Sequence, residues 1–526
     1  MSEKKEKKIE CLCMGDARVC VLLGKQKRPG NGERIRRSQF VFSMTVEGKT
    51  LLFHTLTKKL LLMKEDTFAE KALHGDGNNA TEPTATSIDA TPHCGDRLFR
   101  LTSPLSKYPP LAVESGSPHG VLFPSADELL DASVLDEDDL MKALYEDWFL
   151  VSESVDESQL YLELKSILVV KEELPQGITH YVILPTTTCN ARCFYCFEQG
   201  MEYRKMSKET VEDVLKFIQE HKPKEHKQIH IHWFGGEPMC AADNIDRICN
   251  GLKEAGIEYT AEMTSNGSLF DEESAKKAFE EWKVSEIQIT LDGMAEEYAA
   301  RKQYVGLNAP FDTVIRNVHT LIAAGIKVKI RLNMDENNVE DIYRVADYIK
   351  TEFTDKELEK MRVYVHSLFS HEGEGLDACP AGIGSDALEA KVQEINDHLV
   401  RIGLTGKDLD DLFTLKSHFC MVTAPECNVL IDSSGKLFAC DAMTENMRYG
   451  DVKNGIVAEA WNRIAEPCAV REECKGCMFL TQCTEFDRCP NRVKYDDCYK
   501  QERRKLESDL RFAYSIYRDQ ITIKNS

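Results

Sequence analysis

Apolar and polar residues follow two different patterns along this chain, and the pattern changes near residue 170. Before that point, residues 38–63 (SQFVFSMTVEGKTLLFHTLTKKLLLM) alternate apolar and polar positions around Glu-Gly-Lys, which predicts a β-hairpin leading into a further strand. Residues 126–150 place apolar residues at helical spacing with acidic residues at the expected start, which predicts a helix. Residues 74–97 are rich in Gly, Thr and Pro and predict an insertion loop. These elements predict a small α/β domain over residues 1–170.

After residue 180, strand-type and helix-type patterns alternate. Six βα units with short connections predict a parallel sheet curved into a partial (β/α)6 barrel of the TIM type, so the fold class is α/β. In such a sheet the functional groups are expected at the carboxyl ends of the strands. We assign this barrel to residues 171–375. The six expected strands are residues 180–184, 228–234, 258–264, 286–291, 327–333 and 362–368.

The rest of the chain has a different character. With 526 residues, the chain is too long for one compact core, so several domains are expected. Residues 376–415 are assigned to a linker helix region. Residues 416–526 form a cysteine-rich C-terminal domain, and its last element is a helix over residues 496–520.

Charge and hydropathy exclude two classes of partner. The net charge of −22 argues against nucleic acid, and the basic stretch at residues 24–37 is interpreted as a solvated loop. No apolar run approaches the roughly 20 residues of a membrane span. The charged start, MSEKKEKKIECLCM, lacks the apolar core of a signal peptide, so we expect a cytoplasmic protein.

The chain has 19 cysteines, which in a cytoplasmic protein indicate metal or redox chemistry rather than disulfides. Three of them, Cys189, Cys193 and Cys196, lie on one short loop after the first barrel strand. Three thiolates can hold three irons of a [4Fe–4S] cluster and leave the fourth iron open for another ligand. A single zinc ion would need a fourth ligand from elsewhere, and the spacing alone leaves zinc open.

Polar groups also follow the next barrel strands. The second strand ends in FGGEP (234–238), where paired glycines let the backbone approach a ligand and Glu237 can accept a ligand ammonium. TSNG follows the third strand, TLDG follows the fourth, and Arg331 lies on the fifth. Together they suit a ligand that lies across the barrel mouth.

Over residues 178–370 the chain resembles the radical S-adenosylmethionine (SAM) enzymes, through the Cys-x3-Cys-x2-Cys loop, the aromatic Tyr195 and the GGEP motif. The resemblance implies that the open iron binds the methionine amino and carboxylate groups of SAM, and that a reduced cluster cleaves it to a 5′-deoxyadenosyl radical. It further implies a set of cofactor-binding residues. The motif that contacts the methionine amine consists of Gly235, Gly236, Glu237 and Pro238. The carboxylate or ribose is held by Ser265 and Arg331, and nearby lie Asn266 and Asp292.

The C-terminal cysteines resemble the SPASM extension of the same superfamily, with Gly435 five residues before Cys440 and a Cys-x2-Cys-x5-Cys run from Cys474. The resemblance implies two auxiliary clusters, so three [4Fe–4S] clusters in all. The first would bind Cys420, Cys427, Cys440 and Cys489, and the second Cys474, Cys477, Cys483 and Cys498.

One feature departs from the SPASM pattern. Five residues separate Cys483 from Cys489 where three are usual, and Asp487 occupies the expected ligand position. Asp487 could therefore replace Cys489 as a ligand. A pair of zinc knuckles would use the same thiols and is the alternative. The other eight cysteines, and the pair His230 and His232, are interpreted as packing or surface residues.

The N-terminal domain resembles the winged-helix-like recognition element of SPASM enzymes that mature ribosomally synthesised peptides (RiPPs). The resemblance implies strand addition of a precursor's leader peptide. The alternative is a stabilising domain without a ligand. We therefore expect a peptide maturase that installs a thioether or carbon–carbon crosslink, reduced by a partner such as flavodoxin or ferredoxin. A sulfatase-maturing (formylglycine-forming) enzyme, a peptide epimerase and a non-catalytic metal-bound peptide scaffold are the competing interpretations.

Overall fold

The structure is a computed structural model. It describes residues 9–14, 16–30, 32–47, 49–63, 112–113, 128–137, 139–171, 177–196, 198–224, 228–368, 386–405, 410–413, 415, 421, 425–441, 443–465, 470, 472–482 and 495–525. The predicted insertion loop at 74–97 lies outside these residues.

Six parallel strands form the predicted partial barrel. Each strand pairs with the next one in chain order, so the order across the sheet is β14-β13-β12-β11-β10-β9. All six predicted strands are confirmed, with ends that agree within two residues. They are β9 (His180–Ile183), β10 (Gln228–Trp233), β11 (Glu258–Ser265), β12 (Val284–Thr290), β13 (Lys327–Met334) and β14 (Met361–Ser367).

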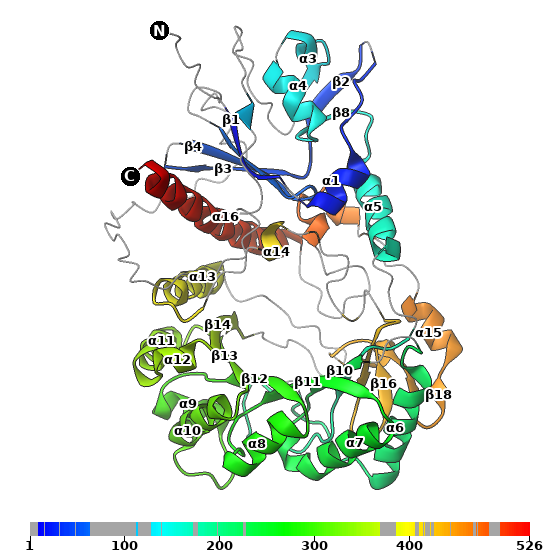
Figure 1. Ribbon diagram of the computed structural model, residues 1–526, viewed down its shortest axis with the longest axis vertical. Coiled ribbons are helices and arrows are strands. Elements are labelled where there is room, and N and C mark those ends of the chain that lie inside the picture. The colour runs from blue at the N-terminus through cyan, green and yellow to red at the C-terminus, as the bar shows by residue number, and fades with distance from the viewer. Residues whose placement is uncertain are drawn as a thin grey trace.

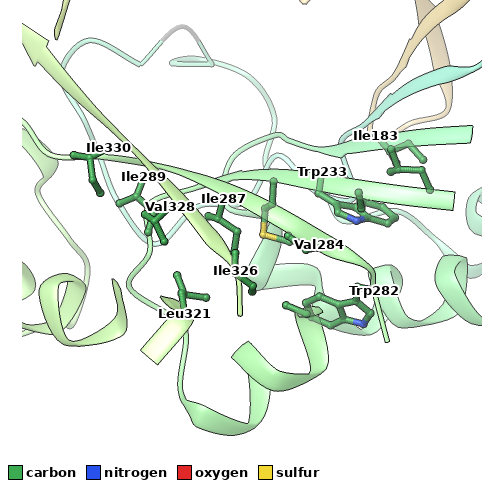
Figure 2. Close-up of a cluster of buried hydrophobic side chains, with 14 of the residues drawn as sticks. Ile183, Trp233, Trp282, Val284, Ile287, Ile289, Leu321, Ile326, Val328 and Ile330 are labelled. Carbon is green, nitrogen blue, oxygen red and sulfur yellow. The ribbon is translucent and has the colours of Figure 1, made fainter. Parts of the chain in front are cut away.

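Helices cover the outer side of this sheet (Figure 1). They are α6 (Lys208–His221), α7 (Ala242–Glu254), α8 (Glu272–Glu280), α9 (Ala295–Lys302), α10 (Pro310–Ala323), α11 (Val339–Glu352) and the short α12 (Asp355–Leu358). Strand residues on this side are buried, and Figure 2 shows Trp233, Ile287 and Val328 on the side where Leu321 of α10 and Trp282 of the turn after α8 lie. The opposite side of the same strands carries half-buried polar residues such as His230 and His232. The barrel is therefore apolar toward the helices and polar toward its concave side.

The barrel sheet continues into the C-terminal part of the chain. Strand β15 (Asn428–Ile431) pairs in parallel with β9, and three antiparallel strands follow it to give ten strands in one sheet. These are β16 (Lys436–Phe438), β17 (Arg448–Asp451) and β18 (Gly455–Ile456), with helix α15 (Ala458–Ala465) after them. The strand that carries the cysteine loop is thus an inner strand of the sheet.

The N-terminal part contains two further sheets. The first has the order β3-β4-β5-β1-β6 and the second the order β7-β2-β8. The predicted hairpin is confirmed, because Val41 of β3 pairs with His54 of β4 and the turn contains Glu47 at a positive φ of 50°. The elements are β1 (Ile9–Met14), α1 (Ala17–Leu23), β2 (Arg34–Arg37), β3 (Val41–Val46), β4 (Lys49–His54), β5 (Lys59–Met63), β6 (Ala112–Val113) and α5 (Glu157–Lys171).

The prediction of one helix over residues 126–150 is wrong. This segment contains β7 (Leu129–Asp131), the short helices α3 (Val134–Glu137) and α4 (Asp139–Glu146), and β8 (Leu150–Ser152). Both strands pair with β2, at Ile35 with Leu130 on one side and Ser152 on the other. A tertiary strand pairing has therefore overridden the local helical pattern at both ends.

The last helix, α16 (Tyr495–Asn525), is longer than predicted and packs on the N-terminal sheet (Figure 1). Alternate residues of β4 face different partners. Leu51 and Phe53 contact the cluster that contains Leu510 and Tyr514 of α16, whereas Leu52 contacts the cluster beneath α3 and α4. The remaining helices are α13 (Asp386–Arg401), in the predicted linker region, and α14 (Asp410–Phe413). Across the described residues, no helix combines the length and apolarity of a membrane span.

Candidate active site at the barrel mouth

Cys189, Cys193 and Cys196 lie on the loop that follows β9, and all three side chains are half-buried. A turn joins the last two cysteines, since the amide of Cys196 donates to the carbonyl of Cys193 at 3.1 Å. The start of the loop is fixed to residue 204, because the Thr186 hydroxyl and the Thr187 amide donate to the Arg204 carbonyl at 2.9 and 2.8 Å. The fold therefore presents three thiols on one braced loop, as the sequence predicted.

The protonation of these thiols depends on what binds them. Burial raises the pKa of Cys189 to about 12 and that of Cys196 to about 11. Both remain thiols at neutral pH unless a cation stabilises the thiolate form. In the part of the chain that the structure describes, no three Cys, His, Asp or Glu side chains converge on one point as single-ion ligands do. In a cubane cluster each of the three thiolates would bind a different iron.

Gly235 and Gly236 pack directly against this loop. A Cβ atom at Gly236 would lie 2.6 Å from the Thr187 carbonyl oxygen, and one at Gly235 would lie 2.4 Å from that of Thr186. The Gly236 amide also donates to the Thr186 carbonyl at 3.2 Å. Only glycine allows this approach, so the pair brings the end of β10 against the cysteine loop.

Glu237 is fully buried and connects the ends of β10 and β11. One carboxylate oxygen accepts hydrogen bonds from the Ser265 hydroxyl at 2.8 Å and the Met239 amide at 3.1 Å, and the other accepts from the Asn266 amide at 2.7 Å. Burial raises the carboxyl pKa, although these hydrogen bonds oppose the shift. Pro238 then begins a single 3-10 turn, η3 (Pro238–Ala241). These three hydrogen bonds fix the carboxylate between the ends of β10 and β11.

Asn266 links the third strand to the cysteine loop. Its side-chain amide donates to Asn190 Oδ1 at 2.8 Å and lies 4.0 Å from the sulfur of Cys189. Ser268 completes the network, since it accepts from Asn190 at 2.9 Å and donates to Asn266 Oδ1 at 2.6 Å. Sequence analysis named Asn266 but not Asn190 or Ser268, which have no motif of their own.

Lys302 is the main site residue that sequence analysis missed. Its ammonium is buried and lies 3.2 Å from the fully buried carboxylate of Asp292, and it donates to the Tyr195 hydroxyl at 2.7 Å. Tyr195 in turn donates to Asp292. Burial lowers the pKa of Lys302, but Asp292 and the neighbouring tyrosines outweigh it and raise that pKa well above its usual value. The side chain therefore stays charged, and its only sequence signal is a lysine at the end of an ordinary amphipathic helix.

Among the described residues, several buried polar atoms near the strand ends have no hydrogen-bond partner. They include Nε of Arg331 and Oδ1 of Asn333, on β13, and Oδ1 of Asp292, after β12. Burial, and next the Arg331 charge, lower the pKa of His366 to about 4, so this histidine is neutral and leaves the arginine as the cation on that side. An unpartnered buried donor and acceptor suit the carboxylate and hydroxyl groups that SAM carries.

The C-terminal cysteines divide between two parts of the fold. Cys427 precedes β15, and its carbonyl accepts from the amides of Thr179 and His180 at 3.0 and 2.9 Å, while Cys440 follows β16. Cys474 and Cys477 are buried around the 3-10 turn η6 (Glu472–Cys474), and Cys498 lies in the first turn of α16. This division parallels the two predicted ligand sets. Cys420, Cys483, Asp487 and Cys489 lie outside the described residues.

His230 and His232 face the concave side of the barrel. Both lie near one oxygen of Glu262, at 3.7 and 3.6 Å, and each forms a hydrogen bond with a threonine of β11. The neighbouring His230, and next His232, lower the pKa of Glu262 to about 2. They are polar packing residues, in keeping with the sequence interpretation.

Residues 183–349 match the family profile described as the radical SAM superfamily. These residues therefore form a radical SAM domain, a class of enzyme domain that uses SAM and a [4Fe–4S] cluster. The match includes the cysteine loop, the GGEP motif and the strand ends described above.

Known proteins are similar to part of the chain. The "Fe-coproporphyrin III synthase" of Methanosarcina barkeri is 28% identical over 174 residues, which is 32% of this chain and 40% of that protein. The "Radical SAM cyclopropyl synthase TigE" of Paramaledivibacter caminithermalis is 24% identical over 146 residues, or 25% of this chain and 31% of that protein. The chain thus spans less than half the length of either relative.

Among solved structures, "Native anSMEcpe with bound AdoMet and Cp18Cys peptide" aligns with a TM-score of 0.51 at 18% identity. The alignment covers 65% of this chain and 99% of that one. At this identity the similarity establishes the fold, and it confirms the predicted partial barrel.

Proposed function

We propose that this chain is a radical SAM peptide maturase that installs a thioether or carbon–carbon crosslink in a ribosomally synthesised precursor. The observation that carries the proposal is the braced three-cysteine loop next to two unpartnered atoms, Arg331 Nε and Asp292 Oδ1, at the mouth of a radical SAM barrel. When bound, the cluster and SAM supply a 5′-deoxyadenosyl radical that removes a hydrogen atom from the substrate.

The strand-end residues would hold the cofactor. Arg331 Nε is a free donor for the methionine carboxylate, and Asp292 Oδ1 is a free acceptor for a ribose hydroxyl. Glu237, with the backbone at Gly235 and Gly236, would receive the methionine amine. Ser265 and Asn266 act through Glu237, since both already donate to it.

A peptide substrate is supported by the solved structure that shares this fold, because that protein has a Cp18Cys peptide bound. In this chain the N-terminal sheet would add the leader peptide as a further strand beside β3, which is an edge strand of that sheet among the described residues. A reducing partner such as flavodoxin or ferredoxin would supply the electron that starts each cycle.

Closing a crosslink removes two hydrogens from the peptide. One leaves as an atom to the deoxyadenosyl group, and the other leaves as a proton and an electron. The electron needs an acceptor, and we assign it to an auxiliary cluster held by the C-terminal cysteines. In this proposal residues 416–526 are a SPASM domain with two such clusters. The division of Cys427 and Cys440 from Cys474, Cys477 and Cys498 supports two separate ligand sets.

The test is a mass spectrum of the small peptide encoded beside the gene, after anaerobic coexpression with this chain. We expect a loss of two hydrogens for each crosslink, located by fragmentation to a pair of residues. A Cys193→Ala chain is the matched control and should leave the peptide unchanged.

The competing functions give different spectra. A formylglycine would appear as an oxidised single Cys or Ser rather than a linked pair. Epimerisation would leave the mass unchanged while 5′-deoxyadenosine still forms. A peptide of unchanged mass and stereochemistry would contradict the proposal and favour a non-catalytic scaffold.

A further inference from the structure

One buried carboxyl oxygen beside the cysteine loop has no hydrogen-bond donor. Among the described residues three glutamates are buried, namely Glu157, Glu198 and Glu237. Glu157 accepts from the Gln39 amide and the Arg36 guanidinium at 2.9 and 2.7 Å. Glu237 accepts the three hydrogen bonds described above, whereas Oε1 of Glu198 accepts from no group among the described residues. A buried carboxyl oxygen without a donor is costly, so this atom indicates a donor that a ligand supplies.

Glu198 lies on a segment that folds back against the cysteine loop, two residues after Cys196. The Met201 amide donates to the Glu198 carbonyl at 3.0 Å, which forms a turn. The Thr187 hydroxyl donates to the Glu202 carbonyl at 2.7 Å and closes the segment onto the start of the loop. The backbone on both sides therefore holds Glu198 next to the three thiols.

An apolar cluster adjoins this turn. Its buried members come from the end of β9 and from the strands that follow the barrel, and they are Leu184, Leu430, Phe438 and Met443. Half-buried residues pack against them, namely Val182, Met201, Phe234 and Met421. We call these eight residues the β9–β16 apolar cluster. Met201 belongs both to this cluster and to the turn that begins at Glu198, so the unpartnered carboxyl group and the cluster are neighbours.

The position of the cluster suits a ligand other than SAM. In the sheet, β15 and β16 lie on one side of β9, whereas β11, β12 and β13 lie on the other. The residues expected to hold SAM follow or lie on those three strands, and the methionine amine is expected at Glu237. Cys440, an expected ligand of the first auxiliary cluster, follows β16 directly. A molecule bound to the apolar cluster would therefore lie between the three-cysteine loop and the expected electron acceptor.

We propose that Glu198 and the β9–β16 apolar cluster bind a lysine or arginine side chain of the precursor peptide, within the segment that is crosslinked. Such a side chain has a long apolar stem and a cationic head that donates hydrogen bonds. The stem packs on the methionines, which adapt to a flexible chain, and the head donates to Oε1 of Glu198. This inference rests on the proposed function, because it adds a recognised residue to the proposed peptide substrate.

The test is a double-mutant cycle between the chain and the peptide. Glu198→Gln keeps the size of the side chain and removes the carboxylate. Its matched control is Glu202→Gln, the same substitution at a nearby side chain that is 77% exposed. The peptide is the small one encoded beside the gene, and in its variants each lysine or arginine of the modified segment is replaced by Met, which keeps an apolar stem without the donor.

Dissociation constants of the labelled peptides are measured by fluorescence anisotropy with the anaerobically reconstituted chain, in the presence of SAM and with the cluster oxidised. For the parent chain, we expect one Met replacement to raise the dissociation constant about tenfold. Glu198→Gln should bind the parental peptide and that variant equally, whereas Glu202→Gln should keep the tenfold difference. Iron content and SAM affinity should be the same in all three chains.

Equal binding of every peptide by the parent chain, a tenfold difference that persists in Glu198→Gln, or a loss of SAM affinity in that variant would overturn the site. A precursor without lysine or arginine in its modified segment would also overturn it. The peptide variants are measured on the unaltered chain, so the site can be refuted even if Glu198→Gln does not fold. A peptide that binds with the expected preference but keeps its mass and stereochemistry under turnover would contradict the proposed function alone.

Discussion

At the residue scale, the polar network under the cysteine loop depends on the buried pair of Lys302 and Asp292. Removing one member of such a pair leaves a buried charge without its counter-charge, whereas removing both charges costs far less stability. We expect Lys302→Met to lower the free energy of unfolding by about 3–5 kcal/mol, and Lys302→Met/Asp292→Asn to lower it by less than about 2 kcal/mol. Denaturant unfolding of the metal-free chain measures both. Equal losses in the two variants would contradict the pairing.

A second residue-scale prediction concerns Gly236. Its substitution by Ala places a methyl group against backbone carbonyls that cannot turn away, so the cysteine loop must move. We expect a stability loss of about 1–3 kcal/mol and a lower iron content after anaerobic reconstitution. Gly30→Ala is the control, because its added Cβ meets nothing closer than 3.7 Å. Iron content equal to that of the parent would show that the approach of β10 does not position the thiols.

The two groups of site residues also show what a sequence can reveal. The cysteine loop and GGEP are local motifs, so their residue types and spacing were visible without the fold. Lys302 is 107 residues from Tyr195, and Asn190 is 76 residues from Asn266. Such pairs exist only after the strands assemble, and a single sequence carries no sign that these side chains are buried together.

At the element scale, the β4–β5 corner of the N-terminal sheet depends on the neutral form of His54. This side chain is fully buried, with Nε2 at 3.0 Å from the Trp148 carbonyl and Nδ1 accepting from the Thr57 amide at 3.2 Å. Burial, reinforced by the charges of Lys59 and Lys58, lowers its pKa to about 3. In the unfolded chain the pKa of this histidine is near 6.5. Its neutral form therefore contributes fully to the stability of the folded state above pH 6.5, and this contribution is lost as the pH falls below that value.

We expect this histidine to reduce stability by about 2 kcal/mol between pH 7 and pH 5. Chemical denaturation at the two pH values measures the difference, and His54→Gln serves as the comparison. The variant should be less stable than the parent at pH 7. Its free energy of unfolding should fall less between pH 7 and pH 5 than that of the parent, by about 2 kcal/mol. An identical pH dependence in the two chains would refute the role of His54.

Some helices and strands could be predicted from their own residues, and others could not. The barrel strands have long apolar runs and helices on one side, so each could be predicted locally. Residues 126–150 failed because β7 and β8 owe their existence to β2, about a hundred positions earlier. In the same way, nothing within Asn428–Ile431 indicates that β15 would extend the barrel sheet beside β9.

At the scale of the whole molecule, the two ends of the chain stabilise each other. Leu510 of α16 is fully buried in the cluster that includes Leu51 and Phe53 of β4, and the Thr55 hydroxyl donates to the Met478 carbonyl at 2.6 Å. We expect Leu510→Ala to cost about 2–5 kcal/mol and to speed amide exchange in β3, β4 and β5. Hydrogen exchange read by mass spectrometry tests this.

The matched control for that prediction is Leu404→Ala, in the hydrophobic cluster of the barrel. It should speed exchange in the barrel and leave the N-terminal strands unchanged. If Leu510→Ala also left amide exchange in β3, β4 and β5 unchanged, the stability of the proposed peptide-binding domain would not depend on the C-terminal helix.

The most direct measurement of the central claim is the amount of 5′-deoxyadenosine formed from SAM by the anaerobically reconstituted, dithionite-reduced chain. The account predicts steady formation by the parent, and none by a variant in which Cys189, Cys193 and Cys196 are all alanine. The two chains should also differ by about four irons. Equal yields from the two chains, or no product from a parent that carries its full iron, would contradict the assignment of this site.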